Sequence, residues 1–566
     1  MTKGKRIFRY FLTVLIVILS LNFTDTGNKT LSSDFASGFT NGVVVSANEI
    51  ASEVGVDIMK RGGNAVDAIV GTAFALAVVY PQAGNIGGGG FMVAKLSDGR
   101  EVSVDFRETA PSSSYRDMYL DSNGNVIPDL STDGHLASGV PGSVEGLLHA
   151  LEKYGTMKRA EVMQYAVSLA ENGYEINSEL ASALNSYGGE FGNYAGSKEI
   201  FGRKFSEGDL LVQKDLAKTL RLISEKGKDG FYSGETADRI VAEMKRGGGI
   251  ISYDDLANYR CVDRNPIKGK YKGYDIITMG PPSSGGICLI YLLNILDSYD
   301  LKFLGSGSSR YINLLAEAMK VVYADRSEYM GDPDFYKVPL KELISKDYAA
   351  ERMKNFAFGK VNRETSPGKI SRESSQTTHI SAADSKGNLV SLTTTLNDVF
   401  GSRVVVQGAG FLLNNEMDDF SVKPGEPNIF GLIGNEANAI APGKRMLSSM
   451  TPVVMMKDGK PFLVIGSPGG GKIITSVLQS ILNIIDFGMP LNEAIDAPRV
   501  HHQWLPDYIQ AEKNSLSAVV IDELKIIGYE IKTVNSFGRV EGIIFDTDGS
   551  MTGHSDRRGS GKAVSF

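Results

Sequence analysis

The stretch from Gln376 to Asn397 predicts a β-hairpin, and this hairpin constrains the fold more than any other segment. Small, β-branched and hydroxyl residues fill both arms, which suits strands, and Asp384–Asn388 between them is a cluster of turn formers. With the turn centred on Lys386, pairing of the arms places Thr377 opposite Thr395 on one face of the sheet. Two threonine hydroxyls therefore converge where the first strand begins.

A polar linker, residues 361–376, leads into this hairpin. It carries almost no apolar side chains, so we expect a flexible segment that runs into a rigid strand. Cleavage of the Gln376–Thr377 bond would give Thr377 a free α-amino group with a pKa of about 7.7–8.0, able to take the proton of its own hydroxyl. One residue would then supply both nucleophile and base. From the hairpin alone, a threonine-rich strand after a polar loop is the simpler interpretation.

Composition narrows the classes of function. The chain has 566 residues, is 42% hydrophobic and carries a formal net charge of −7, which gives ample core for several domains or one large one. Because the chain is mildly acidic and has no dense Lys/Arg run beyond its extreme N-terminus, it does not suit nucleic-acid binding. No metal-ligand spacing occurs, so no metal or cofactor is predicted, and His501–His502 is interpreted as structural. Cys261 and Cys288 exclude a disulfide framework, and two such isolated cysteines are more often free than paired.

The N-terminus has the order of an export signal. Basic residues at positions 3, 5, 6 and 9 precede an apolar run from Tyr10 to Leu21, which is shorter than the ~20 residues of a bilayer-spanning helix. We therefore expect residues 1–27 to direct export to the periplasm, the cell surface or the medium. No clear small-x-small cleavage site follows, so an uncleaved membrane anchor at residues 10–21 stays an alternative.

Hydrophobic periodicity predicts a chain that mixes helices and strands. Val43–Val45 indicates a strand, Glu49–Met59 a helix, and Asn64 the N-cap of a second helix. Further strands are predicted at Met92–Leu96, Val102–Thr109, Phe411–Leu413, Thr451–Met456 and Leu463–Gly466. Further helices are predicted around Ser143–Tyr154, Arg159–Asn172, Gln213–Lys226, Glu235–Arg246 and Tyr311–Tyr323.

A strand, a glycine-rich turn and a helix follow one another late in the chain. The turn, Gly466–Lys472, matches the nucleotide-binding pattern Gly-x-x-x-x-Gly-Lys. However, Ile473 stands where that pattern needs Ser or Thr to bind Mg²⁺, and Pro468 lacks an amide hydrogen. We therefore disfavour a nucleotide site. The amides of Gly469 and Gly470 at a helix N-terminus suit the stabilisation of a developing oxyanion instead.

Two further features are compatible with a binding site. Residues 424–434 combine Pro and Gly hinges with an apolar tip that we expect to be exposed, as in a loop that folds over a site. Arg107, near the end of a predicted strand, can offer a bidentate fork to a carboxylate. Such an arginine more often pairs with a local acid, so alone it is weak support.

Several motifs occur in a fixed order over nearly the whole chain after the export segment. They are Asp105–Glu108, Gly134–Ala137, Gly280–Gly286, Thr377–His379, Asn414–Phe420, Leu447–Met450, Gly466–Gly470 and His501–Pro506. With these motifs in this order, the chain resembles the γ-glutamyltranspeptidases, also called γ-glutamyltransferases. The whole set is specific for that family, although no single motif is. The resemblance implies an α+β fold, a four-layer αββα sandwich of the N-terminal nucleophile hydrolase type.

The resemblance also implies a proenzyme that cuts itself before Thr377. The large subunit would span residues 28–376 and the small catalytic subunit residues 377–566, and the two would stay together as a heterodimer. The enzyme would pass the γ-glutamyl group of a donor, glutathione above all, to an amino acid, a peptide or water. An acylase or a poly-γ-glutamate depolymerase on the same scaffold is the alternative, and a non-catalytic or nucleotide-binding protein would show no cut at Thr377.

The resemblance assigns the catalytic roles position by position. Thr377 would be the nucleophile and, through its new amine, the general base. Thr395 would hydrogen-bond to Thr377 and orient it, which agrees with the pairing inferred from the hairpin. Gly469 and Gly470 would form the oxyanion hole.

It likewise assigns the residues that bind the zwitterionic end of the donor. Hydrogen-bond donors would hold its α-carboxylate, and acceptors and carboxylates would hold its α-ammonium. The first set is Arg107, Ser448 and Ser449, and the second set is Asn397, Glu416 and Asp419. Glu416 stands where relatives use glutamine or glutamate. Phe430 stands where some relatives carry a tyrosine that braces a closed lid, and phenylalanine has no hydroxyl for that bond.

Overall fold

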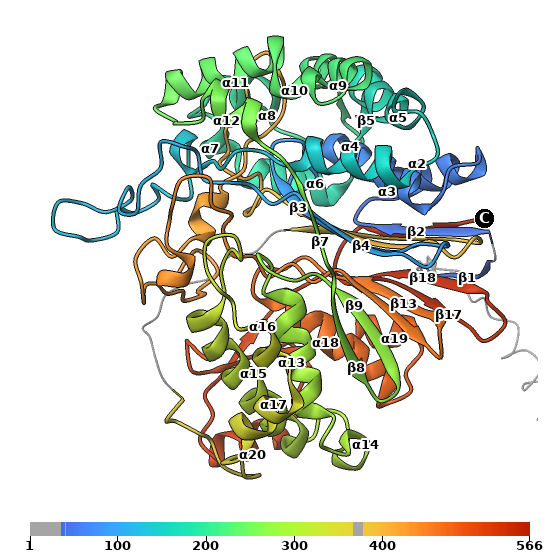
Figure 1. Cartoon of the computed structure of the whole chain (residues 1–566), viewed down its shortest axis with the longest axis vertical. Helices are drawn as coiled ribbons and strands as arrows, with labels where there is room; N and C mark the ends of the chain where they lie inside the picture. Colours follow the sequence, from blue (N-terminus) through green and yellow to red (C-terminus); the bar gives the residue numbers. More distant parts are fainter. Residues whose placement is uncertain (1–34, 40, 366–376) are drawn as a thin grey trace, which may run out of the picture. The chain divides into compact units, whose positions relative to one another are not determined.

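The computed structural model describes residues 35–39, 41–365 and 377–566 (Figure 1). The export segment 1–27 and residues 366–376 of the predicted linker lie outside the described residues. Two seven-stranded sheets form the middle of the structure, and helices cover the outer face of each sheet (Figure 1). The four layers give the α+β, αββα arrangement that the sequence predicts.

The predicted hairpin forms the centre of one sheet. Its strands pair Thr378 with Thr394 and His379 with Thr393, so the turn is centred on Lys386 as predicted. The side-chain carboxylate of Asp384 accepts hydrogen bonds from the Lys386 and Asn388 amides (2.9 and 3.0 Å), which fixes the turn. The order of this sheet is β19 (Lys562–Ser565), β2 (Gly42–Ser46), β10 (Thr378–Asp384), β11 (Leu389–Thr395), β3 (Gly89–Lys95), β4 (Glu101–Asp105) and β7 (Val262–Arg264).

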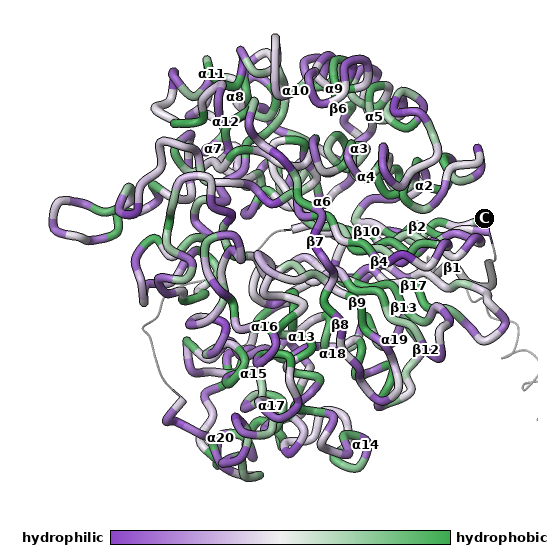
Figure 2. Tube along the Cα trace, in the orientation of Figure 1, coloured by the Kyte–Doolittle hydropathy of each residue, from purple (hydrophilic) through white to green (hydrophobic). Residues whose placement is uncertain are grey.

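The second sheet carries the strand that leads to the glycine turn. Its order is β1 (Phe35–Phe39), β18 (Met551–Ser555), β17 (Glu541–Phe545), β13 (Lys460–Gly466), β12 (Val453–Lys457), β9 (Tyr274–Thr278) and β8 (Ile267–Tyr271). Apolar side chains of both sheets pack together between them, among them Val45, Val93, Val454 and Val464. Figure 2 shows the hydrophobic residues concentrated in these inner strands and the hydrophilic ones on the outer helices and loops. Two small sheets pair β14 (Val500–His501), β15 (Ile509–Glu512) and β16 (Ile531–Val534), and β5 (Tyr174–Glu175) with β6 (Leu210–Leu211).

The outer helical layers follow the chain in two blocks (Figure 1). The hairpin sheet is covered by α2 (Glu49–Lys60), α3 (Ala65–Val79), α4 (Ser143–Tyr154), α5 (Arg159–Asn172), α6 (Ser178–Ser186), α7 (Gly188–Phe191), α8 (Ala195–Phe201), α9 (Lys214–Lys226), α10 (Asp229–Tyr232), α11 (Gly234–Gly247) and α12 (Tyr253–Asn258). The other side holds α13 (Gly285–Leu296), α14 (Leu301–Leu304), α15 (Ser309–Tyr329), α16 (Leu340–Leu343), α17 (Lys346–Met353), α18 (Lys472–Ile485), α19 (Leu491–Asp496) and α20 (Ala518–Ile526). Short 3₁₀ turns lie at His135–Ala137, Glu416–Asp419 and Glu436–Asn438.

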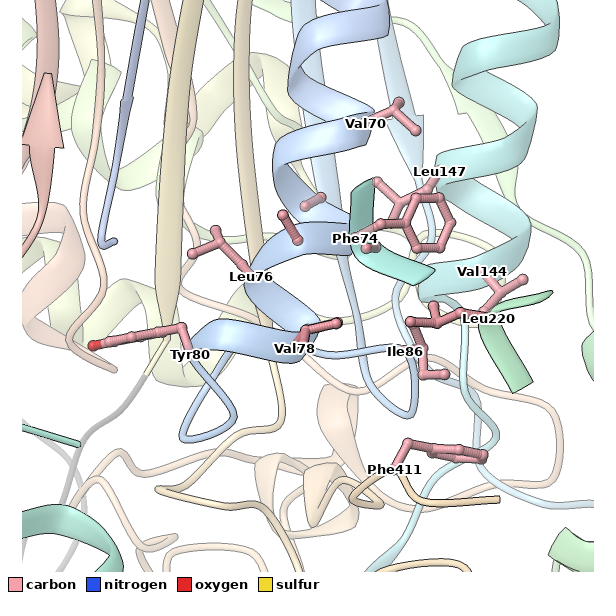
Figure 3. Packing of buried hydrophobic residues seen from close by; sticks show 14 of the residues in the cluster. Val70, Phe74, Leu76, Val78, Tyr80, Ile86, Val144, Leu147, Leu220 and Phe411 are labelled. Carbon is pink, nitrogen blue, oxygen red and sulfur yellow. The ribbon is translucent and has the colours of Figure 1, made fainter. Parts of the chain in front are cut away.

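Helix α3 is the centre of the core on the hairpin side. Every one of its residues is buried, as expected of a helix that is apolar on all sides. Figure 3 shows its Phe74 beside Leu147, and Phe411 belongs to the same buried cluster farther away. Asn64 caps it as predicted, because its side chain accepts hydrogen bonds from the first turn in a capping box.

Two predicted strands were wrong in part or in whole. Residues Phe411–Leu413 form no strand, because Leu412 pairs only with Val405 in an isolated bridge and Phe411 packs into the helical core against Phe231. Burial alone explains that apolar run. The strand predicted at Val102–Thr109 ends at Asp105, where the Asp105 carboxylate accepts a hydrogen bond from the Arg107 amide (3.0 Å) and the chain turns away.

The helix predicted at Tyr311–Tyr323 extends from Ser309 to Tyr329. The Ser308 side chain caps its start by accepting from the Tyr311 amide. Its last turns carry the polar residues Asp325 and Arg326, which are buried in the protein. Because polar residues normally indicate solvent, the sequence pattern placed the end of the helix too early.

The two cysteines are free thiols, and burial raises the pKa of each to about 12. No described helix combines the length and apolarity that crossing a bilayer requires. Within the described ranges, no group of His, Cys, Asp and Glu side chains is arranged to hold a metal ion.

Candidate active site

A small cavity lies beside the open ends of the hairpin strands and the glycine turn. Every predicted site residue except Gly469 lines it, and Gly469 lines a neighbouring cavity together with Arg539 and Arg558. The lining of the first cavity is Arg107, Thr377, Thr395, Asn397, Glu416, Asp419, Phe430, Leu432, Ser448, Ser449, Met450, Gly470 and Ile473.

Thr377 and Thr395 come together through the hairpin register. Since Thr378 pairs with Thr394, the next residues outward are Thr377 and Thr395, and both are buried. The Thr395 hydroxyl accepts a hydrogen bond from the Asn397 amide (2.7 Å). That bond helps to hold Asn397 at φ 79°, a left-handed conformation that is uncommon for a residue other than glycine.

His379 connects the strand of Thr377 to the strand of the glycine turn. One ring nitrogen lies 2.8 Å from the Thr393 hydroxyl and the other 3.2 Å from the Ser381 hydroxyl. A Cβ at Gly466 would come within 2.2 Å of the ring, so only glycine allows this contact. Burial lowers the pKa of His379 to about 3, so the ring is neutral at physiological pH and does not suit a proton shuttle there.

A buried guanidinium faces three carboxyls on one side of the cavity. Arg107 is 1% exposed and pairs with Glu416 (Nη1 to Oε1, 2.8 Å), Asp419 (Nη2 to Oδ2, 2.5 Å) and Glu108 (Nη1 to Oε2, 3.6 Å). Its Nε also donates to the Met446 carbonyl (3.2 Å). Because three acids share one cation, the cluster would gain a favourable partner if a second cation entered.

The protonation of these acids reflects that imbalance. Burial raises the pKa of Glu416 well above its ordinary range, and burial also raises the pKa of Asp419. Burial raises the pKa of Glu108 to about 8, although the Arg107 charge opposes the shift. An ammonium bound nearby would lower all three pKa values and favour the carboxylates.

Two serine hydroxyls face the cavity with their protons available. The Ser448 hydroxyl accepts from the Met450 amide (3.1 Å), and the Ser449 hydroxyl accepts from Arg326 Nη2 (3.1 Å). Because both partners are pure donors, each hydroxyl keeps its own proton to donate, which suits an anionic ligand. Ser284 holds the pair in place, since its amide and hydroxyl donate to the Ser448 carbonyl (2.8 and 2.6 Å).

Gly469 and Gly470 turn the chain from β13 into α18. Their φ angles of 135° and 55° lie in the region that favours glycine. The carbonyl of Gly469 accepts from the Lys472 amide (3.0 Å) and that of Gly470 from the Ile473 amide (3.2 Å), so the helix begins here. Among the described hydrogen bonds, neither glycine N–H donates one, which leaves both amides at a helix N-terminus able to bind negative charge.

Residues 424–434 lie over this cavity, as their Pro and Gly content predicts. Asn428 Oδ1 accepts from the Phe430 and Leu432 amides (3.0 and 3.1 Å), and Asn428 Nδ2 donates to Asp419 Oδ1 (2.8 Å). Gln503 Nε2 donates to the Phe430 carbonyl (3.2 Å). The expectation of an exposed tip was wrong, because the Phe430 side chain is buried against Gly470.

A sequence model of the family described as Gamma-glutamyltranspeptidase matches residues 51–566. The chain belongs to the γ-glutamyltranspeptidase family. Glutathione hydrolase proenzyme from Escherichia coli (strain K12) is 49% identical over 524 residues, which cover 91% of this chain and 90% of that protein. As a member of this family the chain is an enzyme.

Solved structures of γ-glutamyltranspeptidase relatives show the same fold. Cephalosporin acylase from Bacillus halodurans aligns with a TM-score of 0.84 at 27% identity and covers 96% of this chain and 99% of that chain. γ-Glutamyltranspeptidase from Helicobacter pylori aligns with a TM-score of 0.56 at 48% identity, over 58% of this chain and 94% of that chain. The α+β sandwich of N-terminal nucleophile hydrolase type, predicted from the motifs, is thereby confirmed.

Two residues of the site were not predicted as functional. Glu108 follows Arg107 within one of the family motifs, so its position in the motif was a signal. Arg326 lies in no motif, and nothing in its sequence surroundings points to the cavity. Its role is visible only because α15 brings it against Ser449.

Proposed function

We propose that this γ-glutamyltranspeptidase cuts itself before Thr377 and then cleaves the γ-glutamyl bond of glutathione, passing the γ-glutamyl group to an amino acid, a peptide or water. The observation that carries the proposal is the single cavity that gathers Thr377, a helix-terminal glycine amide, hydroxyl donors and a carboxylate cluster. Each of these groups suits one part of a γ-glutamyl donor. The charged and polar lining of the cavity suits the two charged groups at one end of the glutamyl moiety.

The donor's α-carboxylate would bind Arg107, Ser448 and Ser449, because these are hydrogen-bond donors. Its α-ammonium would bind Asn397, Glu416 and Asp419, which supply oxygen acceptors. Arg107 already pairs with both acids, at 2.8 and 2.5 Å, so a zwitterion would extend this ion-pair cluster at both ends. The hydroxyls of the two serines would donate hydrogen bonds to the carboxylate.

Acyl transfer would begin when the Thr377 hydroxyl oxygen attacks the donor's γ-carbonyl carbon and its proton passes to the free α-amine of Thr377. The carbonyl oxygen becomes an oxyanion, which the Gly469 and Gly470 amides stabilise. The carbon–nitrogen bond then breaks, the leaving amine takes the proton, and a γ-glutamyl ester remains on Thr377. Water or an acceptor amine attacks that ester, the ester bond breaks, and the threonine hydroxyl recovers its proton.

Self-cleavage would divide the chain into a large subunit, residues 28–376, and a small subunit, residues 377–566, that remain a heterodimer. The register supports this, because Thr377 is the residue just before β10 and would become the first residue of the small subunit. The predicted export signal, residues 1–27, supports action outside the cytoplasm. An acceptor amino acid or peptide would reach the site from that compartment.

An acylase is the second candidate, because the structure is also similar to cephalosporin acylase. The carboxylate cluster favours the γ-glutamyl donor, since three acids around Arg107 would be well matched to a donor that carries an α-ammonium. An acyl donor without that ammonium would bring no second cation, so Arg107 would remain the only cation paired with the three acids. Comparing donors with and without the ammonium therefore separates the two candidates.

The proposal is tested by intact mass and N-terminal sequencing of the purified protein beside Thr377→Ala. The expected result is a wild-type fragment that begins Thr-Thr-His-Ile and a single uncut chain in the variant. Release of glutamate from glutathione by the cut protein completes the test. A folded wild-type protein that stays whole, or a cut protein that leaves glutathione intact, would exclude the proposal.

A further inference from the structure

Arg326 contacts Ser449, one of the two serines that line the cavity. It comes from the buried last turns of α15, seen in the lower half of Figure 1. Its Nη2 donates to the Ser449 hydroxyl (3.1 Å) and its Nε to the Ser284 hydroxyl (2.9 Å). The residue is 4% exposed, so these serines and the protein around them replace its hydration.

Arg326 forms no ion pair with an acid among the described residues, and the nearest acidic influence on its charge is the longer-range attraction of Asp419. Other buried arginines do form an ion pair: Arg499 pairs with Asp556 (2.6 Å), and Arg403 pairs with Asp398 (2.8 Å). Burial lowers the pKa of Arg326, yet a guanidinium stays charged in proteins. Burying a cation without a directly paired acid costs free energy, and structural arginines are usually paired.

Arg326 also fixes the direction of the Ser449 hydroxyl. Arginine has only N–H donors, so the Ser449 oxygen must accept, and its own proton turns elsewhere. No described residue accepts that proton, and Ser449 lines the cavity beside Thr377. Arg326 therefore has two effects on this wall of the cavity. It leaves the Ser449 hydroxyl free to donate a hydrogen bond, and it adds a positive electrostatic potential.

We propose that Arg326 is a positioning residue for the donor's α-carboxylate, which acts through Ser449. The bound carboxylate adds a second negative charge near Arg326, and the Ser449 hydroxyl accepts a hydrogen bond from Arg326 and donates one to the carboxylate. Arg107 would hold the carboxylate while it is itself paired with Glu108, Glu416 and Asp419. Arg326 forms no such pair with a described acid, and Asp419 attracts its charge only over a longer distance. This inference rests on the proposed function and deepens it, because it makes Arg326 a source of selectivity for donors that carry an α-carboxylate.

A purely structural role makes a different prediction. Arg326 would then only hold the loop of Ser448 and Ser449 against Ser284, and its loss would weaken every donor equally. The readout that separates the two roles is the selectivity between donors, measured as the ratio of their kcat/KM values. Absolute activity alone would not separate them.

Three p-nitroanilide donors test this selectivity. γ-Glutamyl-p-nitroanilide carries both charges, glutaryl-p-nitroanilide keeps only the carboxylate, and 4-aminobutyryl-p-nitroanilide keeps only the ammonium. Each is assayed with the processed wild type, Arg326→Met, Arg326→Lys and the control Arg310→Met. Arg310 lies on the same helix but is exposed, so the control makes the same change without touching the cavity.

We expect Arg326→Met to lower kcat/KM about tenfold or more for the two carboxylate donors and less than about threefold for the 4-aminobutyryl donor. Arg326→Lys keeps a positive charge but loses the guanidinium fork, so a smaller loss of selectivity, about threefold, is expected. Arg310→Met should match the wild type. In a Ser449→Ala background the effect of Arg326→Met on selectivity should shrink, because the connecting hydroxyl is gone.

An equal loss on all three donors, or unchanged selectivity, would overturn the inference. If Arg326→Met does not accumulate as processed enzyme, Arg326→Lys decides, and wild-type selectivity in that variant overturns the inference too. A wild type that is cut before Thr377 but does not turn over the γ-glutamyl donor would instead exclude the proposed function, and the inference with it. These two failures are therefore distinguishable.

Discussion

The chemistry of single residues in this site depends on how charges are matched. Arg107 forms ion pairs with three acids, whereas Arg326 forms none with the described acids and interacts with Asp419 only at longer range. A zwitterion would correct both imbalances, because its ammonium would join the acids and its carboxylate would join the serines and Arg326. In the proposed function the site would therefore recognise the pair of charges at the α-carbon, and Thr377 would act on a carbonyl beyond them.

Asp419→Asn tests the acidic half of this arrangement. In the proposed function the Asp419 carboxylate would attract the ammonium, while asparagine keeps the shape and an oxygen acceptor for Asn428 but carries no charge. We expect kcat/KM for γ-glutamyl-p-nitroanilide to fall about tenfold to a hundredfold, and kcat/KM for glutaryl-p-nitroanilide to change far less. Glu436→Gln, at an exposed acid, is the control. Equal losses on both donors would contradict a specific role in binding the ammonium.

The buried His379 should make the free energy of unfolding depend on pH. Burial lowers the pKa of His379 to about 3, whereas the unfolded imidazole has a pKa of about 6.5. Between these values only the unfolded chain takes up the proton, so the free energy of unfolding falls by about 1.4 kcal/mol for each unit of pH lowered. Above pH 6.5 this contribution to stability is fully present, and it is lost as the pH falls toward 3.

The measurement is denaturant unfolding between pH 7 and pH 4 in the uncut Thr377→Ala chain, which avoids separation of subunits. Thr377→Ala with His379→Gln should lose stability less steeply with acid, by about 1.4 kcal/mol per pH unit. Identical slopes in the two proteins would show that His379 is charged in the fold. His501 is buried with a pKa lowered to about 3 as well, so a His501→Gln variant should behave similarly.

At the scale of single helices, strands and loops, some features could be predicted from the sequence and others could not. The hairpin register followed from a local turn, and the α3 cap from Asn64, because both depend on neighbours in the sequence. The strand predicted at Phe411–Leu413 was wrong because burial, not pairing, explains its apolar side chains. A loop over the site was predicted from residues 424–434, but the contacts that hold it could not be, since they involve Asp419 and the distant Gln503.

Asn428→Ala tests what holds this loop closed. The substitution removes the acceptor of two loop amides and the donor to Asp419, three hydrogen bonds in all. We expect faster proteolytic cutting within residues 424–434 and a KM for the γ-glutamyl donor that rises several-fold, since the cavity would lose its cover. Peptide mapping of the cut sites, beside the exposed control Asn123→Ala, provides the check. Unchanged cutting and an unchanged KM would mean that the remaining contacts of the loop, such as those of Ile429 with Asp418 and of Phe430 with Gln503, hold it without Asn428.

At the scale of the whole molecule, the proposed subunits are interleaved rather than adjacent. The hairpin of β10 and β11 would begin the small subunit, yet it lies between β2 and β3, which would belong to the large subunit. In the other sheet, β1, β9 and β8 of the large subunit flank strands of the small one. The family motifs predicted two associated subunits, but this interleaving could not be predicted, because strand order between distant segments leaves no local pattern.

Interleaving predicts that cutting the chain does not free the subunits. After cleavage β10 keeps its antiparallel pairing with β2, and β11 keeps its pairing with β3, so separation must break both ladders and expose the core between the sheets. We expect the processed protein to elute as one particle with both fragments in equal amounts, over a wide range of salt. High salt screens exposed ion pairs but leaves buried pairing and apolar contacts intact.

Urea should then separate the fragments only in the same transition that unfolds the sheets. The two events are followed together, by size-exclusion chromatography for association and by far-ultraviolet circular dichroism for structure. Coincident midpoints are expected because a hairpin taken from the centre of a sheet leaves two exposed strand edges behind. Fragments that separate at a urea concentration where the circular dichroism is still native would show that the subunits merely dock through their surfaces.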